Sequence, residues 1–246
     1  MAGKRDRAGA KTGGRFLLLR IALMLLGITF SYTGSALCAF AAIGQGPVGA
    51  FQYSLSVLSG MKMGTVALLF QGTFVFLQFL LERSNFKVRQ LLQLLITFYG
   101  GAVLNFVLYG LLGLIREPLP YVLRLAVLIF GFALNAFGVS LSLESDTIRV
   151  PMEGFLLLLS QRLPVTLGRL KQISDWLLLA VSLVICIAGR IPLTVREGTV
   201  LNALLFGLFL DAFHGRMGSF FRGLRGAAAD DTQQRDPDET MNEVRR

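Results

Sequence analysis

Long apolar runs, separated by short polar or proline-containing segments, dominate the chain from residue 16 to residue 213. A helix needs about 20 apolar residues to cross the roughly 30 Å hydrocarbon core of a bilayer. Because these runs do not alternate between apolar and polar positions as membrane β-barrel strands do, they predict an all-helical polytopic membrane protein. The runs of suitable length lie at residues 16–43, 63–82, 89–115, 119–143, 172–189 and 197–213.

Two shorter segments follow prolines, at about residues 48–59 after Pro47 and 152–162 after Pro151. A helix of about twelve residues reaches only about 18 Å, which is too short to cross the hydrocarbon core. The sequence therefore predicts about six spans plus two short or re-entrant helices. Eight spans are the alternative, if the short helices do cross.

The chain contains the same pattern twice. LRIALMLLGITFSYTG at residues 19–34 matches LRLAVLIFGFALNAFG at residues 123–138, and GAVLNFVLYG at residues 101–110 resembles GTVLNALLFG at residues 198–207. One arginine and two glycines recur in register in the first match: Arg20, Gly27 and Gly34 as Arg124, Gly131 and Gly138. These matches predict two sequence-related halves, each with three long helices and one short proline-led helix.

The matches also predict how the chain is divided. A basic N-terminal segment (1–15) precedes the first membrane repeat (16–115), and a hinge (116–118) leads to the second membrane repeat (119–214). The polar tail (215–246) has almost nothing to bury, so we expect it to be disordered. With three crossings per half the second repeat would be inverted relative to the first, as in many transporters. With four crossings per half the repeats would be parallel.

Composition and charge agree with a membrane protein. The chain of 246 residues is 54% hydrophobic and 16% charged, with a mean hydropathy of +0.63. One soluble core cannot bury this amount of apolar surface. The net charge is +9, but the basic residues flank the apolar runs and are not interleaved with exposed aromatic residues, so we expect no nucleic-acid binding.

The basic residues at the two ends of the chain indicate its orientation. Five precede the first run, namely Lys4, Arg5, Arg7, Lys11 and Arg15, and three follow the last run, namely Arg216, Arg222 and Arg225. Cytoplasmic segments carry such excess positive charge, so both termini are expected in the cytoplasm.

Residue types that serve catalysis or metal binding are sparse. His214 is the only histidine, and Cys38 and Cys186 both fall inside apolar runs. The chain lacks a CxxC pair, a nucleophile elbow and a phosphate-binding GxxxxGK motif. We therefore expect no enzyme activity, no cofactor and no metal site.

The turn before the first short helix is a candidate binding site. GQGPVG at residues 44–49 formally fits a dinucleotide fingerprint, but it follows a predicted transmembrane helix rather than a strand, which excludes a nucleotide site. Gly44 and Gly46 free the backbone to turn, and Pro47 begins the helix, where a missing N–H costs nothing. The N-terminus of this helix can bind an anion or polar ligand, unless the segment is a plain turn at the membrane surface.

The equivalent turn in the second half is more polar. ESDTIRVPMEG at residues 144–154 includes Glu153 at the start of the second short helix. If the segment re-enters the membrane, Glu153 is a candidate ligand for a cation or a proton; if it faces the cytoplasm, it is a solvated loop. Asp175 stands four residues after Lys171, a spacing that permits a local ion pair on one helix face.

A few polar residues interrupt the apolar runs. Asn105 and Asn202 are equivalent in the two halves, Asn135 lies in the fourth run, and Asp211 lies near the end of the last. Asparagine in a membrane helix most often bonds a neighbouring helix, although the equivalent pair could also line a polar path. The candidate substrate-binding residues are therefore Gly44, Gly46, Pro47, Asn105, Asn135, Pro151, Glu153, Asp175, Asn202 and Asp211.

Several of these features together resemble the YczE/YitT-like family of bacterial integral membrane proteins. The resemblance covers most of residues 16–214 and rests on the arginine-led first helix with spaced glycines, the Gly44–Pro47 turn, Pro151 before a helix, and Gly198-Thr199 before an apolar helix that contains Gly207. It implies a multi-pass protein of the bacterial plasma membrane and names no substrate.

Duplication and broken helices favour a transporter or permease for a small solute, with a site between the two repeats. The expected partners are the lipid bilayer and a small solute or coupling ion. The alternative is a membrane scaffold or regulatory partner protein that transports nothing, and a channel is a third possibility. A transporter requires a polar cavity lined from both halves, whereas a scaffold can be packed solid.

Overall fold

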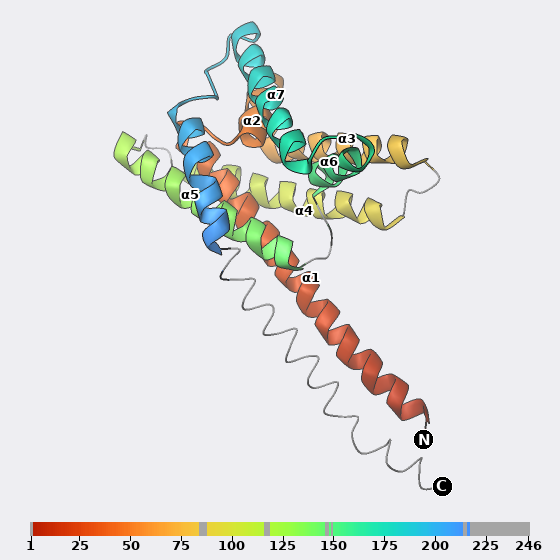
Figure 1. Cartoon of the computed structure of the whole chain (residues 1–246). Helices are drawn as coiled ribbons and strands as arrows, with labels where there is room; N and C mark the ends of the chain where they lie inside the picture. The colour runs from red at the N-terminus through yellow and green to blue at the C-terminus, as the bar shows by residue number, and fades with distance from the viewer. Residues whose placement is uncertain are drawn as a thin grey trace, which may run out of the picture.

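The computed structural model describes residues 2–83, 88–115, 119–145, 148, 150–213 and 216, without the side chains of residues 2–17, 88 and 89. The predicted hinge (116–118) and nearly all of the predicted disordered tail (215–246) lie outside this description. The described ranges contain helices and no strand (Figure 1). The long helices are α1 (Ala2–Ala41), α3 (Met63–Glu82), α4 (Leu92–Asn105), α5 (Tyr121–Ser145) and α7 (Leu167–Ala188), and the short ones are α2 (Pro47–Ser59) and α6 (Pro151–Arg162). A further helix, here called the C-terminal helix, covers residues 197–213.

The lengths of these helices confirm the prediction of an all-helical polytopic membrane protein. Five segments of the described chain are long and apolar enough to cross a bilayer: Leu18–Ala41, Met63–Glu82, Leu92–Leu114, Tyr121–Ser145 and Leu167–Ala188. The sixth predicted run, residues 197–213, is also helical. The two short helices have 13 and 12 residues, which is about 20 Å or less of helix. Six spans plus two short helices therefore stays the preferred prediction over eight spans.

Two predicted runs differ from the helices in detail. The run predicted at 172–189 begins earlier, at Leu167, because the hydroxyl of Thr166 accepts a hydrogen bond from the Arg169 amide at 3.4 Å and caps the helix. The run predicted at 89–115 is not one uniform helix. Its first turn is the 3₁₀ helix η2 (Val88–Leu91), and after α4 it continues as the π-helix η3 (Phe106–Leu111) and the 3₁₀ helix η4 (Leu112–Leu114).

Helices α1 and α5 cross near the centre of the molecule and form the most extensive pair among helices α1 to α7 (Figure 1). They run antiparallel, because Gly27 lies against Gly138 and Gly34 lies against Gly131. A Cβ atom added to Gly27 would lie 2.7 Å from the Gly138 carbonyl oxygen, and one added to Gly34 would lie 2.5 Å from that of Gly131. Small residues at these positions let the two backbones approach closely, as membrane helix pairs require.

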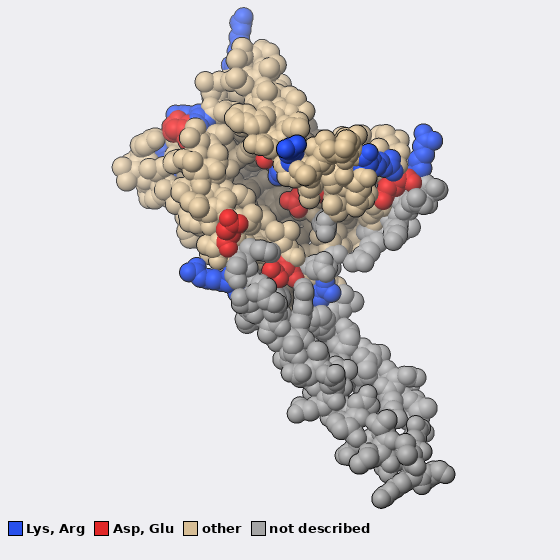
Figure 2. Space-filling model, viewed as in Figure 1, with Lys and Arg blue, Asp and Glu red and all other residues tan. Residues whose placement is uncertain are grey.

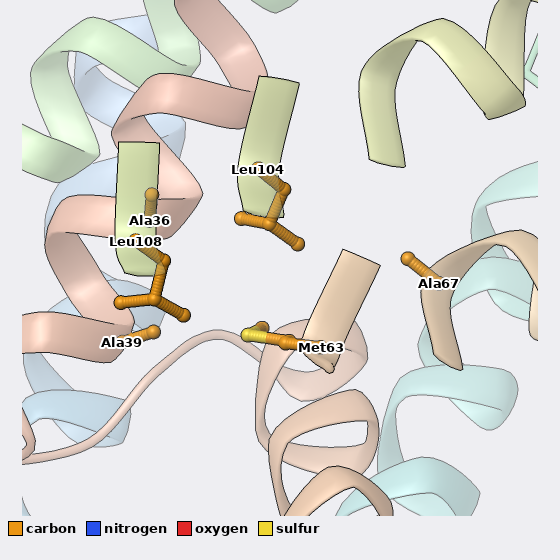
Figure 3. Close-up of a cluster of buried hydrophobic side chains, with 6 residues drawn as sticks. All are labelled: Ala36, Ala39, Met63, Ala67, Leu104 and Leu108. Atoms are coloured by element: carbon orange, nitrogen blue, oxygen red, sulfur yellow. The ribbon is translucent and has the colours of Figure 1, made fainter. Parts of the chain in front are cut away.

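Among the described residues, three buried apolar clusters hold the helices together, and the first two include residues of this pair. The first joins α1, α3 and the α4–η3 segment, as Figure 3 shows: Ala36, Ala39, Met63, Ala67, Leu104 and Leu108. The second joins the end of α1 to α5 through Cys38, Ala41, Ile43, Leu128 and Phe132. The third is built on Met152, Leu156 and Leu170 of α6 and α7, with Val48 of α2 packed against it. Val48, near the N-terminus of α2, therefore lies against the cluster to which α6 and α7 contribute.

Each short helix packs mainly on a long helix from the other half of the chain. Helix α2 has its most extensive contact with α7, and α6 has its most extensive contact with α3. Helices from before residues 116–118 therefore pack against helices from after them. Both parts of the chain line the space between these helices.

Candidate functional site

A cavity of about 480 Å³ lies between α1, α4, α5, α6 and α7. Figure 2 shows this face of the molecule hollowed between the crossing of α1 with α5 and the ends of α6 and α7, with acidic side chains in view there. Most of the wall is apolar: Met24, Ile28, Ile96, Val139, Leu143, Ile148, Val150, Leu156 and Leu167. The polar lining residues are Ser31, Tyr32, Ser142, Glu153 and Lys171. A mainly apolar hollow of this size with a few polar groups is typical of a small-molecule site; we call it the central cavity.

Two charged residues line the central cavity. Glu153 lies in the first turn of α6, and Lys171 lies near the start of α7. The Lys171 Nζ atom is 3.0 Å from Oδ1 of Asp175, so the ion pair that the sequence permits is present. Ionisable groups are costly within a membrane protein unless they are paired, and they usually mark a functional path. These three residues therefore carry the candidate chemistry.

The position of α6 is set by glutamines on two neighbouring helices. Oε1 of Gln71 accepts a hydrogen bond from the Met152 amide at 3.1 Å. Nε2 of Gln78 donates to the Pro151 carbonyl oxygen at 2.7 Å and to Oε1 of Gln93 at 3.2 Å. All three glutamines are buried. They anchor the N-terminus of α6 to α3 and α4, and they hold Glu153 at the cavity wall.

Sequence reasoning missed these glutamines. The available signal is their placement: Gln71 and Gln78 are seven residues apart in an otherwise apolar run, which puts them on one face of the helix. A pair of amides on one face of a membrane helix indicates a polar contact with a neighbouring segment. Which segment they contact follows only from the fold.

The turn before α2 packs against the C-terminal helix and does not line the central cavity. Gly44 has φ +122°, and a Cβ atom there would lie 2.7 Å from the Thr199 amide nitrogen. A Cβ atom on Gly46 would lie 2.7 Å from Oδ1 of Asn202. Pro47 begins α2 as predicted. The close approach of two segments thus accounts for both glycines of the turn.

Two of the predicted asparagines join neighbouring helices. Oδ1 of Asn105 accepts a hydrogen bond from the Gly64 amide at 2.8 Å and so caps the N-terminus of α3. Nδ2 of Asn135 donates to the Ser35 hydroxyl at 2.8 Å, and its Oδ1 accepts from the Ser31 hydroxyl at 3.3 Å. Asn135 therefore contacts a residue of the cavity wall, whereas Asn105 does not.

The predicted site residues thus fall into two groups. Glu153 lines the central cavity, Asp175 pairs with a lining residue, Asn135 bonds to one, and Pro151 begins the helix that carries Glu153. The others are not among the lining residues: Gly44, Gly46, Pro47, Asn105, Asn202 and Asp211. That residues of either group bind a solute stays a prediction.

Arginine side chains cap the ends of the central helix pair. Nε of Arg20 donates to the Ser145 carbonyl oxygen, and Nε of Arg124 donates to the Ala41 carbonyl oxygen, both at 2.7 Å. The last carbonyls of a helix lack partners within the helix and carry partial negative charge, so a guanidinium stabilises them. The last carbonyls of each helix are therefore bound by an arginine of the other: Arg124 near the start of α5, and Arg20 near the start of the apolar part of α1, Leu18–Ala41.

A second cavity of about 450 Å³ lies beside the ends of α1 and α2. Its wall consists of Ala39, Phe40, Ala42, Tyr53, Ser56, Val57, Gly60, Met61, Leu108 and Tyr109. None of these lining residues is charged. The central cavity is therefore the better candidate for recognising a polar solute.

The described residues contain no group of three or more histidine, cysteine, aspartate or glutamate side chains that could hold a metal ion. No curated protein and no solved structure is significantly similar to the chain. A family profile described as a family of unknown function (DUF6198) matches residues 18–215. The match includes every helix that lines the central cavity. The chain therefore belongs to this family of unknown function.

Proposed function

We propose that the protein is a transporter or permease for a small solute and that the central cavity is its binding site. The observation that carries this proposal is that Glu153 and Lys171 line one mainly apolar hollow between helices from both halves of the chain. Ionisable residues within membrane proteins usually mark the path of a solute or an ion. The ion pair with Asp175 at 3.0 Å holds Lys171 at this wall in its charged form.

We also propose that the two halves are repeats of inverted topology. The contacts of the central pair support this, because exchanging equivalent residues of the two matched segments converts the Arg20–Ser145 hydrogen bond into the Arg124–Ala41 hydrogen bond. The contact of Gly27 with Gly138 is related in the same way to that of Gly131 with Gly34. Reciprocal contacts of this kind are those of two antiparallel helices about a twofold axis, which inverted repeats require.

Inversion fits six spans, with α2 and α6 as re-entrant helices and both termini in the cytoplasm. The resemblance to the YczE/YitT-like family supports a bacterial plasma membrane. In many transporters of this plan, one group of helices rocks against another around a central site. Here α6 is bound to α3 and α4 through glutamines, so these helices would move together against the α1–α5 pair. Such motion would open the central cavity to alternate sides.

A matched pair of variants tests the proposed site. Ile96 lines the central cavity, whereas its neighbour Leu95 is 66% exposed on the outer face of α4. The full chain is reconstituted in proteoliposomes, and uptake is measured for a panel of amino acids, amines, carboxylates and sugars. We expect Ile96→Trp to abolish the uptake of the transported solute, because the indole fills the cavity, and Leu95→Trp to preserve it. Equal uptake by the two variants, or no uptake of any solute by the folded wild type, would contradict the proposal.

The second candidate function is a membrane scaffold or regulatory partner protein. It is favoured by α7, which is the least buried of the five candidate spans. The exposed apolar residues of α7 include Ile173, Trp176, Leu177, Val184 and Ile187. A folded protein that moves no solute but co-purifies with a membrane partner through α7 would support this second function over the first.

A further inference from the structure

We infer that the second cavity is the outer part of the solute path and that the apolar cluster of Figure 3 is the closed gate between this cavity and the central cavity. The inference rests on the proposed function, because it completes the route to the same binding site. We call this cluster the gate cluster; it consists of Ala36, Ala39, Met63, Ala67, Leu104 and Leu108.

The gate cluster is in contact with both cavities. Ala39 and Leu108 belong to the cluster and also line the second cavity. Tyr32 packs against the cluster and lines the central cavity. The gate cluster therefore separates the two cavities. An apolar constriction of this kind is a known form of gate in membrane proteins, because it excludes water when it is closed.

One face of α1 and one face of α4 run from the central cavity to the gate cluster. Tyr32, Ala36 and Ala39 are four and three residues apart, so they lie on one face of α1 and span about 10 Å. On α4, Ile96 lines the central cavity and Leu104 belongs to the gate cluster, eight residues further on. Ala36 and Leu104 are 0% and 1% exposed, so the gate is closed. Separation of these two faces would connect the cavities.

Two hydrogen bonds hold the α4–η3 segment to the first turn of α3. The hydroxyl of Tyr109 accepts a hydrogen bond from the Met63 amide at 3.1 Å, and Oδ1 of Asn105 accepts one from the Gly64 amide at 2.8 Å. Tyr109 lines the second cavity, and Met63 belongs to the gate cluster. The first bond therefore joins the wall of the outer cavity to the gate. A single neutral hydrogen bond contributes little net free energy, so it can break and form again in each transport cycle.

The π-helix η3 gives the gate a way to move. Leu108 and Tyr109 both lie within η3, at Phe106–Leu111. Short π-helical turns in α-helices are rare and are frequent at functional sites. Conversion of this turn to α-helical bonding would rotate the following side chains by about 100°, the angle of one residue of α-helix. Such a conversion changes the directions of Leu108 and Tyr109 together, which opens the gate and breaks the bond to Met63.

The two cavities lie at different depths along the apolar part of α1, Leu18–Ala41. The central cavity is lined from residues 24–32 of this helix, and the second cavity from residues 39–42 at its end. With the N-terminus in the cytoplasm, the end of α1 lies toward the outside. A solute from outside therefore meets the second cavity first. Since the lining residues of that cavity carry no charge, it passes the solute on to the central cavity, where Glu153 and Lys171 lie.

A bulky label in the second cavity tests whether the solute passes there. Val57 lines this cavity and its neighbour Leu58 does not, although both are exposed, at 41% and 48%. Each is changed to cysteine in the full chain with Cys38→Ala and Cys186→Ala, labelled with fluorescein maleimide after purification, and reconstituted in proteoliposomes. Uptake is measured for the solute panel used with Ile96→Trp. We expect labelled Val57→Cys to lose uptake and labelled Leu58→Cys to keep it.

A second experiment tests the gate and needs no solute. Leu104→Cys in the same cysteine-free background is treated in intact cells with a membrane-impermeant thiol reagent. Tyr109→Phe should make its labelling about fivefold faster, the factor that one neutral hydrogen bond contributes. The matched control is Tyr99→Phe, which removes a hydroxyl bonded to Thr29 at 2.8 Å outside the gate cluster and should not change the rate. Ala136→Cys, fully buried on α5, should stay unlabelled in both variants, which distinguishes gate opening from unfolding.

Wild-type uptake by labelled Val57→Cys would overturn the inference. Equal labelling of Leu104→Cys in the Tyr109→Phe and Tyr99→Phe variants would overturn it too, and so would equally faster labelling of Ala136→Cys. The proposed function survives these results if Ile96→Trp blocks an uptake that Leu95→Trp preserves. If the folded wild type takes up no solute, the proposed function falls and the inference falls with it.

Discussion

Nε of Arg124 donates a hydrogen bond to the carbonyl oxygen of Ala41 at 2.7 Å, across 83 positions of sequence. Ala41 is the last residue of α1, and Nη2 of the same arginine also reaches the Ala42 carbonyl oxygen at 3.0 Å. A single guanidinium therefore holds the end of one membrane helix against the start of another. Because Nε of Arg20 makes the reciprocal hydrogen bond to the Ser145 carbonyl oxygen, helices α1 and α5 are hydrogen-bonded at both ends of their contact.

Replacement of Arg124 by glutamine should destabilise the protein. The variant leaves the Ala41 carbonyl oxygen without its charged donor, whereas Arg196 still reaches that of Ala42 at 3.3 Å. Loss of such a hydrogen bond costs about 1–3 kcal/mol. Thermal unfolding in detergent should show a lower Tm for Arg124→Gln, while Arg169→Gln should unfold like the wild type. A Tm for Arg124→Gln equal to that of the wild type would show that the capping bond contributes nothing.

The close approach of α1 and α5 predicts a steric effect of a single methyl group. In Gly138→Ala the new Cβ atom would lie 2.3 Å from the Ser31 amide nitrogen, which is backbone and has little freedom to move. We expect a lower Tm and a lower yield of folded protein. The matched control is Gly207→Ala in the C-terminal helix, where no atom lies within 4 Å of the added Cβ atom. That variant should be as stable as the wild type or more stable, since alanine favours a helix over glycine by about 1 kcal/mol.

The glutamine anchor of α6 predicts a loss of both stability and uptake. Gln78→Leu removes the donor to Pro151 and Gln93 and leaves their oxygens buried without it, at a cost of about 1–3 kcal/mol. It should lower the Tm and reduce uptake of the transported solute, because Glu153 depends on the position of α6. Gln172→Leu, at an exposed position on α7, should change neither. If Gln78→Leu kept wild-type uptake, the anchor would not serve the site.

The Lys171–Asp175 pair separates stability from function. The two side chains are 42% and 29% exposed, and an exposed ion pair contributes only about 0–1 kcal/mol to stability. Asp175→Asn and the double variant Lys171→Met with Asp175→Leu should therefore both keep a Tm close to that of the wild type in thermal unfolding. Both should take up less solute than the wild type. Wild-type uptake by the double variant would show that the charge of Lys171 is not used.

Topology can be tested at Lys62 and Arg83, which are both exposed. With six spans and two re-entrant helices, Lys62 faces the outside and Arg83 the cytoplasm; with eight spans the two sides are exchanged. Each position is changed to cysteine in a Cys38→Ala, Cys186→Ala background, and intact cells are treated with a membrane-impermeant thiol reagent. We expect labelling of Lys62→Cys before lysis and of Arg83→Cys only after it. The opposite pattern would establish eight spans.

Features that depend on neighbouring residues could be read from the sequence. The apolar runs marked the long helices, and Pro47 and Pro151 marked the first residues of α2 and α6. The Lys171–Asp175 pair was accessible for the same reason, because four residues of helix bring the two side chains to one face. Glu153 was also identified, since an acidic residue at the start of a short membrane helix is unusual whatever surrounds it.

The central cavity, the glutamine anchor and the arginine caps required the fold. Gln78 and Pro151 are 73 positions apart, and Arg20 and Ser145 are 125 apart, so no local pattern relates them. The predicted asparagines illustrate the same limit: Asn105 and Asn135 both bond neighbouring helices, yet only Asn135 does so at the cavity wall. Helix length and helix ends follow from hydrophobicity and backbone chemistry along the chain, whereas the space between helices follows from how whole helices cross and pack.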